Sequence, residues 1–274
     1  MIPHSPAAPP TGPVPVPRFV RRLAGRDRVT PVWRNELGGL TFRLDPAGGH
    51  ASEPDDRGPA RFVKWSPVAT GLDLAAEAAR LRWAGRWTPV PQVLDHGTVD
   101  DDGDDSDGAG PAQYLVTAAL PGRSAVDPRW LAEPATAVRA LGAGLRALHD
   151  ALPVAACPFD WGIHERLART GPEGEKVTAA ERAALADAPE VDRLVVCHGD
   201  ACAPNTLLDD AGRWSAHVDL GRLGVADRWA DLAVAAWSTE WNYGPGYEHL
   251  VYAAYGVEPD AERIAYYRRL WAAT

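Results

Sequence analysis

Four polar side chains that could carry out phosphate or metal chemistry lie within one short stretch, VVCHGDACAPNTLLDDAGRWSAHVDLG, at positions 195–221. These residues are His198, Asp200, Asn205 and Asp219, and they lie between two apolar segments. Two interpretations fit this pattern: a pair of strands joined by a polar turn, or a site that holds metal and phosphate.

Phosphoryl transfer would explain these residue types. Such an enzyme needs metal ions across the phosphates, a group that orients the attacking hydroxyl, and a cation that holds the nucleotide. Asp200, on a loop, can accept the hydroxyl proton, and Asn205 can offer a carbonyl oxygen to Mg2+ five residues later. Asp219 adds a second hard oxygen ligand of the kind that Mg2+ requires.

Zinc is the competing metal, because two cysteines flank His198. Cys197 and Cys202 do not form a CxxC pair, however, and the chain has no second pair, so the spacing argues against zinc. For His198 itself we favour a structural role, in which it hydrogen-bonds near the loop, over a catalytic or ligand role. Three cysteines without a regular framework fit a reducing cytosol, and we expect a cytoplasmic protein.

The N-terminal part of the chain supplies the partners that a kinase-like lobe needs. Lys64 in RFVKW is one of only two lysines, and Glu77 follows thirteen residues later in LAAEAAR. A glycine-containing turn, NELGG, separates the first two expected strands and includes Gly38 and Gly39. The order of strand, helix and turn favours an ATP site over a lone surface lysine.

Hydrophobic periodicity predicts an α+β protein with two lobes. Strands are expected at 29–33, 40–44, 60–65, 89–99 and 112–120, and a helix at 72–85. Further helices are expected at 135–150, 178–188 (with Thr178 as N-cap), 227–241 and 260–271, with one small strand pair among them. The predicted organisation is a disordered or polyproline-like proline-rich tail at 1–17, an N-terminal nucleotide-binding lobe at 18–115, a hinge at 116–122, and a mostly helical catalytic and substrate lobe at 123–274.

With these motifs in order, the chain resembles the aminoglycoside phosphotransferase family, which has a protein-kinase-like fold. VVCHGDACAPN followed by DLGRLGVADRWADLA is the most specific part. TPVPQVLDHG, YLVTAALPG, LRALHDALPVAACPFD and ERIAYYRRL support the resemblance in the correct order, over roughly residues 30–270. Within the family, the kanamycin/neomycin 3′-kinases and the streptomycin 3″-kinases look most similar.

The resemblance implies a role for each matched position. Asp200 would be the catalytic aspartate, and Asn205 and Asp219 the magnesium ligands. Lys64 would contact the α- and β-phosphates, and Glu77 would hold that lysine. Thr117 and Ala119 would pair with adenine through the hinge backbone. Gly38 and Gly39 would lie over the phosphates.

The substrate half departs from the family pattern. Leu37 stands where many members have a serine, and the chain ends YYRRLWAAT, without the acids common in the 3′-kinases. The acids that remain near matched positions are Asp160, Glu165 and Glu240, and we take these with Trp241 as candidate substrate contacts. Surface positions for the acids and core packing for the aromatic residues are the alternatives.

The composition narrows the class of partner. A net charge of −9 argues against a nucleic-acid-binding surface and suits a cationic ligand, and no apolar run is long enough to cross a membrane. We therefore expect an ATP- and Mg2+-dependent kinase of a cationic aminoglycoside antibiotic, of the streptomycin or kanamycin type, that confers resistance and is a monomer or weak dimer. The alternatives are a kinase of another small hydroxylated metabolite and a nucleotide-binding pseudokinase that acts as a regulator.

Overall fold

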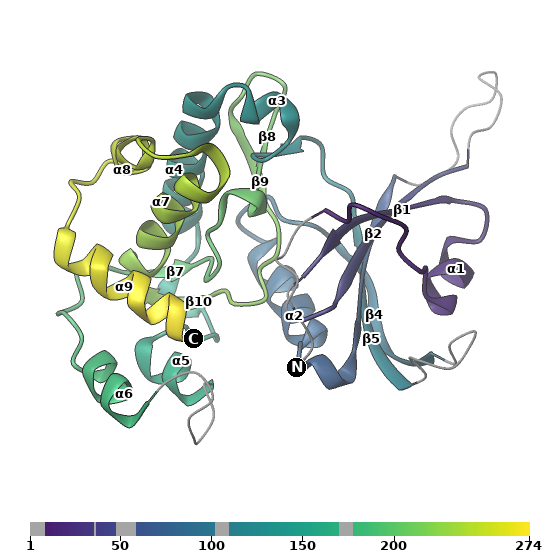
Figure 1. The fold of residues 1–274 in the computed structure, drawn as a ribbon, viewed down its shortest axis with the longest axis horizontal. Coiled ribbons are helices and arrows are strands. Elements are labelled where there is room, and N and C mark those ends of the chain that lie inside the picture. The colour runs from purple at the N-terminus through teal and green to yellow at the C-terminus, as the bar shows by residue number, and fades with distance from the viewer. Residues whose placement is uncertain (1–8, 36, 48–58, 102–109, 170–177) are drawn as a thin grey trace. The chain divides into compact units, whose positions relative to one another are not determined.

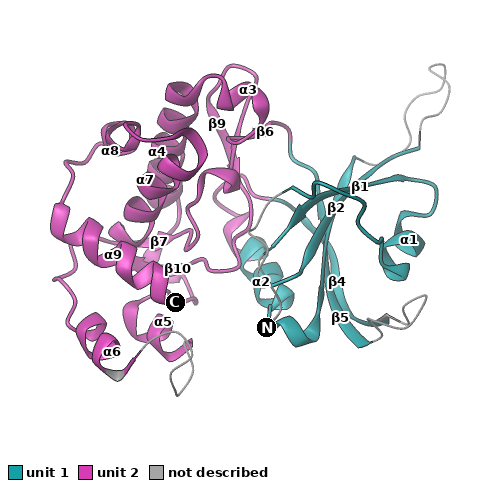
Figure 2. Cartoon of the chain, in the orientation of Figure 1, with its two compact units in different colours: residues 1–82, 91–120 teal, residues 83–90, 121–274 magenta. Residues whose placement is uncertain are grey.

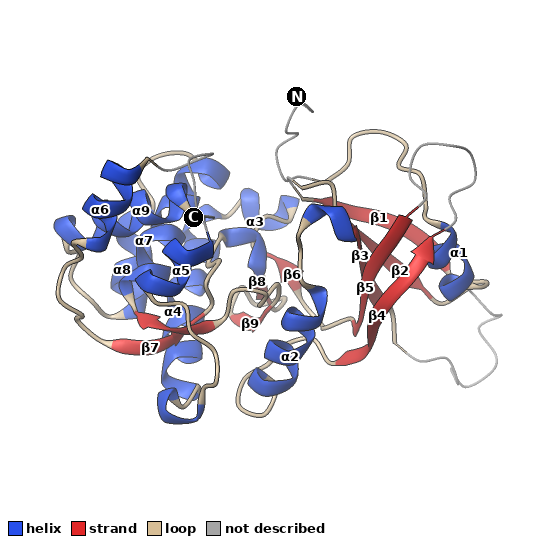
Figure 3. Ribbon diagram, turned by 90° about the horizontal axis from the view of Figure 1, so that it is seen from below, coloured by secondary structure: helices blue, strands red, loops and turns tan. Residues whose placement is uncertain are grey.

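The computed structural model describes residues 9–35, 37–47, 59–101, 110–169 and 178–274. The chain divides into unit 1, formed by residues 1–82 and 91–120, and unit 2, formed by residues 83–90 and 121–274 (Figure 2). Unit 1 is built around an antiparallel sheet and unit 2 is mostly helical, as the colouring of Figure 3 shows. The predicted α+β class is therefore confirmed.

The sheet of unit 1 has five antiparallel strands in the order β1-β2-β3-β5-β4 (Figure 1). Their bounds are β1 Arg28–Arg34, β2 Leu40–Asp45, β3 Arg61–Pro67, β4 Val93–Asp101 and β5 Gly110–Ala118. All five correspond to predicted strands. The apolar, β-branched and aromatic residues in these runs suit a half-buried pleated surface.

One face of this sheet is covered by a short helix that the sequence analysis did not anticipate. Helix α1 (Arg18–Ala24) buries Val20 against Phe42, Leu44 and Val63 of the sheet. Alternation places Phe42 and Leu44 on the same face of β2, which explains why a single helix can cover both. The seven-residue helix is too short for a 3.6-residue period to stand out in the sequence.

The proline-rich tail is described only from residue 9 onward. Residues 1–8 lie outside the described residues. Residues 9–17 form no helix or strand, which agrees with a polyproline-like segment, but Val14 and Val16 pack against the core of unit 1. Of the two alternatives, the polyproline-like one suits this part of the tail better, because its alternating valines have an apolar surface to contact.

The predicted helix, α2 (Leu74–Ala84), lies on the opposite face of the sheet. The end of α2 and the residues after it, 83–90, belong to unit 2. Figure 1 shows α1 and α2 on opposite sides of the sheet. Trp83, near the end of α2, is buried in unit 2, where its indole nitrogen donates to the Ala156 carbonyl oxygen at 3.2 Å. This contact explains why residues 83–90 group with unit 2, which no local pattern predicts.

Unit 2 is built around helix α4 (Pro134–Ala151), which packs on α7 and α8. The other helices are α3 Pro128–Leu131, α5 Ile163–Arg169, α6 Ala179–Ala186, α7 Trp229–Tyr243, α8 Glu248–Tyr255 and α9 Ala261–Ala273. Helices α4, α6, α7 and α9 were predicted, and Thr178 caps α6 through a reciprocal capping box with Glu181, as expected. Helices α3, α5 and α8, of four to eight residues, were missed.

The strands of unit 2 differ from the single predicted pair. β7 (Leu194–Cys197) pairs with β10 (Gly224–Asp227), and β8 (Thr206–Leu208) lies between β6 (Arg123–Ser124) and β9 (Trp214–His217). The polar stretch after β7 therefore separates two small sheets and does not form the turn of one hairpin. Strands of two to four residues carry too little periodicity to predict their partners.

The chain passes between the units at 82/83, at 90/91 and finally at Leu120 and Pro121, the last of these inside the predicted hinge at 116–122. Strand β5 extends to Ala118, so the first part of that segment belongs to the sheet. In the described part of the chain, no helix combines the length and apolar composition needed to cross a bilayer.

Candidate active site

The loop after β7 carries the first of the predicted polar residues. From β7 the chain turns through His198 and Asp200, and the 3-10 helix η3 (Ala203–Asn205) leads into β8. His198 is fully buried, and its Nε2 lies 3.0 Å from the Val218 carbonyl oxygen. This placement agrees with the structural role that we favoured for His198.

Asp200, Cys202 and Asn205 form a closed ring of hydrogen bonds. The Asn205 side-chain nitrogen donates to the Asp200 carbonyl oxygen at 2.9 Å, and the Asn205 amide donates to the Cys202 carbonyl oxygen at 3.0 Å. Cys202 Sγ completes the ring by donating to Asp200 Oδ1 at 3.1 Å. Because Asn205 uses its nitrogen in this ring, its amide oxygen is the atom that it can offer to a cation.

Asp219 comes next to Asn205 through the β8–β9 hairpin. Thr206 pairs with His217 in that hairpin, and the Val218 amide donates to the Asn205 carbonyl oxygen at 3.0 Å. Among the described residues, Asp219 is the one non-glycine residue with a positive φ, 64°. Such a backbone persists only where its surroundings determine it, and it is common at functional sites.

Gly199 brings the loop of Asp200 against the loop that follows Asp219. Its φ is 85°, and a Cβ atom on it would lie 2.2 Å from the Arg222 carbonyl oxygen. Backbone cannot move aside as a flexible side chain can, so only glycine fits here. The two loops that carry the predicted site residues are therefore in direct backbone contact.

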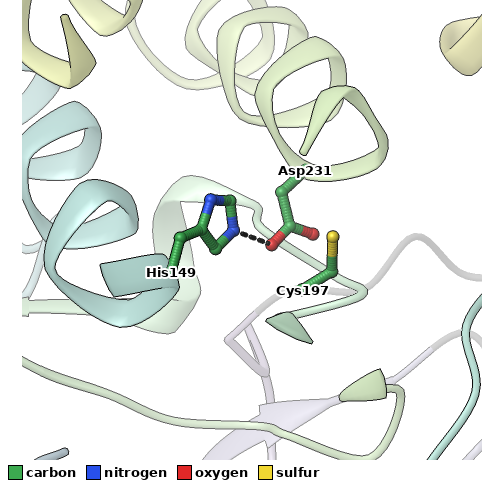
Figure 4. A group of neighbouring side chains, drawn as sticks. All are labelled: His149, Cys197 and Asp231. Atoms are coloured by element: carbon green, nitrogen blue, oxygen red, sulfur yellow. Dashed lines mark hydrogen bonds and ion pairs between the residues drawn. The ribbon is translucent and has the colours of Figure 1, made fainter. Parts of the chain in front are cut away.

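A buried carboxylate on α7 holds the start of the Asp200 loop. Asp231 is fully buried, and its two oxygens accept the amide of His198 at 2.6 Å and the amide of Gly199 at 2.9 Å. His149 on α4 makes a third contact, with Nε2 at 3.0 Å from Asp231 Oδ2 (Figure 4), and its Nδ1 lies 2.9 Å from the Tyr255 hydroxyl.

Figure 4 also shows Cys197 beside this pair, and His149, Cys197 and Asp231 are close enough together to be considered as a metal site. Their partners argue against it, because both Asp231 oxygens already accept hydrogen bonds and the Cys197 thiol donates to the Asp227 carbonyl oxygen. Burial raises the pKa of Cys197, which keeps it a neutral thiol. Burial alone would also raise the pKa of Asp231, but the hydrogen bond and charge of His149 hold it below its ordinary value.

In unit 1, Lys64 and Glu77 form the predicted ion pair. Lys64 lies on the face of β3 opposite Val63, and its Nζ is 2.7 Å and 2.9 Å from the two oxygens of Glu77. Glu77 lies in the first turn of α2 and is 4% exposed. This two-oxygen contact holds the lysine ammonium in one position on the sheet.

The turn between β1 and β2 is held by the side chain of Asn35. Asn35 Oδ1 accepts the amides of Leu37 at 3.0 Å and Gly39 at 2.7 Å. Gly38 has a φ of 89°, and a Cβ atom on Gly39 would lie 2.6 Å from the Asn35 side-chain nitrogen. The positive φ of Gly38 favours glycine at that position, and a side chain at Gly39 would displace the Asn35 side chain that holds the turn.

Thr117 and Ala119, the residues expected to contact adenine, differ in which of their backbone groups are already hydrogen-bonded. Thr117 lies in β5 between Phe62 and Val93 and is 9% exposed. The amide of Ala119 donates to the Ala60 carbonyl oxygen at 2.8 Å. The Ala119 amide is therefore already used at the edge of the sheet, and a backbone contact of Ala119 with adenine would come from its carbonyl oxygen.

Two of the candidate substrate acids have local partners. Asp160 Oδ1 accepts the Gly162 amide at 2.6 Å, just before α5. Glu165 in α5 is 4.0 Å from Arg169 one turn later. These contacts are what the surface interpretation predicts, so neither acid is assigned to the site by its geometry.

Trp241 belongs to a cluster of three indoles, Trp237, Trp241 and Trp271, which we call the tryptophan cluster. The ring of Trp241 lies 4.8 Å from that of Trp237 and 5.4 Å from that of Trp271, and Trp241 is 48% exposed. Its neighbour Glu240 shares a hydrogen bond with Glu248, which raises the pKa of Glu240. The cluster therefore combines internal packing with an exposed aromatic face.

Helix α7 links the tryptophan cluster to the Asp200 loop. Ser238 is fully buried, and its hydroxyl accepts the amide of Ala203 at 3.0 Å. Trp241 follows Ser238 by three residues, which places the two on neighbouring parts of the helix surface. An acceptor substrate held at Asp200 would therefore lie on the unit and helix that carry this aromatic face.

Sequence reasoning assigned no role to Asp231, Ser238 or Cys202, although all three contact the loop. For Asp231, a signal was present: WADLAVAA is an apolar helix with one acid, and a buried acid requires hydrogen-bonding partners. Cys202 was considered only as a zinc ligand, and Ser238 gave no signal, because a serine is more often exposed than buried.

Comparison with known proteins identifies similar sequences along most of the chain. The model of the phosphotransferase enzyme family matches residues 55–267. An aminoglycoside 3′-phosphotransferase of Streptomyces fradiae is 36% identical over 262 residues, which is 86% of this chain and 91% of that protein. A streptomycin 3″-kinase of Streptomyces griseus is 34% identical over 241 residues, which is 77% of this chain and 83% of that protein.

Solved structures show the same fold. The aminoglycoside phosphotransferase APH(3″)-Id of Streptomyces rimosus, in complex with ADP and streptomycin, superposes with a TM-score of 0.63. It is 26% identical to this chain, and the match covers 93% of this chain and 95% of that one.

The buried carboxylate of Asp231 generates a stability prediction. We expect Asp231→Asn to lower the free energy of unfolding by about 2 kcal/mol or more, because an amide NH2 would face backbone donors that need an acceptor. Urea unfolding of the variant and the wild type measures this difference.

The stability that Asp231 contributes should also depend on pH. Since folding lowers the pKa of Asp231, its contribution is fully present above the unfolded pKa of about 4 and is lost as the pH falls through the folded value. The difference between wild type and Asp231→Asn should therefore shrink below about pH 4. Asp187→Asn, at an exposed acid, serves as the control; a loss of stability as small as in that control would contradict the role of Asp231.

Proposed function

The chain belongs to the phosphotransferase enzyme family, and from this we propose that it transfers the terminal phosphoryl group of ATP to a hydroxyl group of an aminoglycoside. The observation that carries the proposal is the closed hydrogen-bonded loop that presents Asp200 and Asn205 beside Asp219. The names of similar proteins, aminoglycoside 3′-phosphotransferase and streptomycin 3″-kinase, support this acceptor class.

Asp200 is proposed as the group that receives the acceptor hydroxyl. Its carboxylate lies on a loop whose backbone is held by Asp231, Ser238 and Asn205. In phosphoryl transfer the protein contributes mainly position and electrostatics, so a loop held at several points suits this role. The carboxylate orients the hydroxyl and accepts its proton as the bond to phosphorus forms.

Asn205 and Asp219 are proposed as the ligands of Mg2+. The donor set fits this ion, because Asn205 has its amide oxygen available and Asp219, which follows the residue bonded to the Asn205 carbonyl, can supply a carboxylate. When bound, Mg2+ neutralises charge on the phosphates. The positive φ of Asp219 would then be a backbone constraint that keeps this carboxylate at the hairpin end.

Lys64 is proposed to contact the α- and β-phosphates of ATP, with Glu77 holding its ammonium in place. The turn that includes Gly38 and Gly39 would cover the phosphates with backbone amides. Thr117 and the carbonyl of Ala119 would contact adenine. ADP in the structure of the Streptomyces rimosus relative supports a nucleotide substrate of this kind.

The tryptophan cluster supports a guanidinium-bearing acceptor over one that carries only ammonium groups. Planar, weakly hydrated guanidinium groups stack on aromatic faces better than ammonium groups do. Trp241 offers such a face on α7, and the C-terminal end of the chain lacks the acids that would favour ammonium groups. We therefore propose streptomycin as a better acceptor than kanamycin, with Glu240, Asp160 and Glu165 as supporting acids.

An ADP-release assay with a panel of aminoglycosides, with the products identified by mass spectrometry, tests the proposed activity. We expect phosphorylated product from the wild type, and Asp200→Ala should lower kcat by about 10²–10⁴-fold while nucleotide binding stays intact. The reason is that Asp200 would act on the acceptor hydroxyl and not on the nucleotide.

Asp210→Ala, at an acid exposed elsewhere on unit 2, is the matched control and should keep wild-type activity. Product formation by Asp200→Ala at more than half the wild-type rate would refute the assigned role. Nucleotide binding without product from any aminoglycoside would favour the regulator or the metabolite kinase instead.

Metal dependence gives a separate prediction. Asp219→Asn should weaken Mg2+-dependent binding of a non-hydrolysable ATP analogue more than Asn205→Ala does, because it removes a charged ligand. Asparagine tolerates a positive φ, so the backbone at this position is retained. Calorimetry with and without Mg2+ measures the effect, and equal affinities of Asp219→Asn and wild type in Mg2+ would contradict the assignment.

Acceptor preference tests the tryptophan cluster. We expect a higher kcat/KM for streptomycin than for kanamycin, and Trp241→Ala should lower the streptomycin value by about 2–30-fold, which corresponds to a cation–π contact of about 0.5–2 kcal/mol. Trp87→Ala removes another partly exposed indole and is the control. A kanamycin preference that Trp241→Ala leaves unchanged would refute both the preference and the contact.

A further inference from the structure

The carboxylate of Asp200 accepts a hydrogen bond from an unusual side-chain donor, the thiol of Cys202. The Sγ atom lies 3.1 Å from Asp200 Oδ1. Within the part of the chain that the structure describes, this thiol is the one donor to that carboxylate. The contact therefore distinguishes Oδ1 from Oδ2, which otherwise would be equivalent.

The backbone around Cys202 keeps the thiol in this position. Its carbonyl oxygen accepts the amide of Asn205, and it stands directly before η3, with φ −71° and ψ 150°. The next residue, Ala203, donates its amide to the buried hydroxyl of Ser238 on α7. With its backbone held on both sides, Cys202 can move its sulfur only by rotating the side chain.

A carboxylate at the end of an aspartate has a broad torsional preference and rotates easily when nothing holds it. A bond to Oδ1 restricts that rotation and directs Oδ2 toward the remaining space. Transfer to a hydroxyl depends on such alignment, because misplacement of a reacting group by about 1 Å can lower the rate by about 10²-fold.

We propose that Cys202 is a positioning residue for the phosphoryl transfer, whose thiol fixes the rotation of the Asp200 carboxylate so that Oδ2 meets the acceptor hydroxyl. The inference rests on the proposed function, in which Asp200 receives that hydroxyl. In this role Cys202 acts through its hydrogen bond to Asp200 and not on the reacting atoms themselves.

If the Cys202 sulfur only filled space, removing it would have the same effect as removing another half-buried sulfur. Cys157 provides the comparison, because it is also partly buried and its thiol donates to a backbone oxygen, that of Phe159, at 3.5 Å. Both residues are half-buried, so removing either sulfur removes packing. Only the change at 202 removes a hydrogen bond to the carboxylate of Asp200.

The kinetic test compares Cys202→Ala, Cys202→Ser and Cys157→Ala with the wild type. Cys202→Ala should lower kcat by about tenfold, with KM for ATP and aminoglycoside changed by less than about twofold, because alignment is lost while binding is retained. Cys202→Ser should recover to within about threefold of wild type, since a hydroxyl can donate to the same oxygen from a shorter side chain. Cys157→Ala should match the wild type.

Two kinetic outcomes would overturn the proposal. One is a Cys202→Ala enzyme with wild-type kcat. The other is a Cys202→Ser enzyme as slow as Cys202→Ala at equal thermal stability, which would mean that the lost sulfur volume, and not the hydrogen bond, is responsible.

An infrared measurement does not depend on turnover or on the folding of Cys202→Ala under assay conditions. The S–H stretching band of Cys202, isolated as a difference between wild type and Cys202→Ser, should shift to higher frequency when Asp200→Ala removes the acceptor. An unshifted band would overturn the hydrogen bond itself. A shifted band in a protein that phosphorylates no aminoglycoside would instead place the failure with the proposed function.

Discussion

The position of the Asp200 loop depends on one fully buried carboxylate. Asp231 projects from α7 and accepts two consecutive backbone amides, those of His198 and Gly199, which would otherwise be buried without acceptors. An amide buried in this way costs more than a formed hydrogen bond gains, so the loop has one well-defined arrangement. Since Ser238 of the same helix holds Ala203, α7 fixes the loop before and after Asp200.

In unit 1, the ammonium group of Lys64 is held by an ion pair. Lys64 on a strand and Glu77 on a helix meet in a two-oxygen ion pair, and each side chain is carried by regular backbone. A partly buried ion pair adds little net stability, because desolvation offsets much of the attraction. Its value here is geometric, since an ammonium on a long flexible stem is confined to one place on the sheet.

Much of the fold could be predicted, and the reasons for the exceptions are physical. The five strands of unit 1 and helices α2, α4, α7 and α9 are long enough for their periodicity to be read, and spacing was sufficient to select Asp200, Asn205, Lys64 and Glu77 as candidates. The pairing of β7 with β10 and the occupied amide of Ala119 depend on residues distant in the chain. Cys202 acts through the direction of its side chain, which spacing alone does not encode.

The contact between Gly199 and the Arg222 carbonyl oxygen has a consequence for motion. Because the two loops touch through backbone, without an intervening side chain, neither can shift without displacing the other. Thermal fluctuation would therefore carry Asp200 and Asp219 together as one rigid piece, and the separation of their carboxylates would depend mainly on side-chain rotation. Because α7 holds the Asp200 loop, a movement of that helix would be passed through this contact to the loop that follows Asp219.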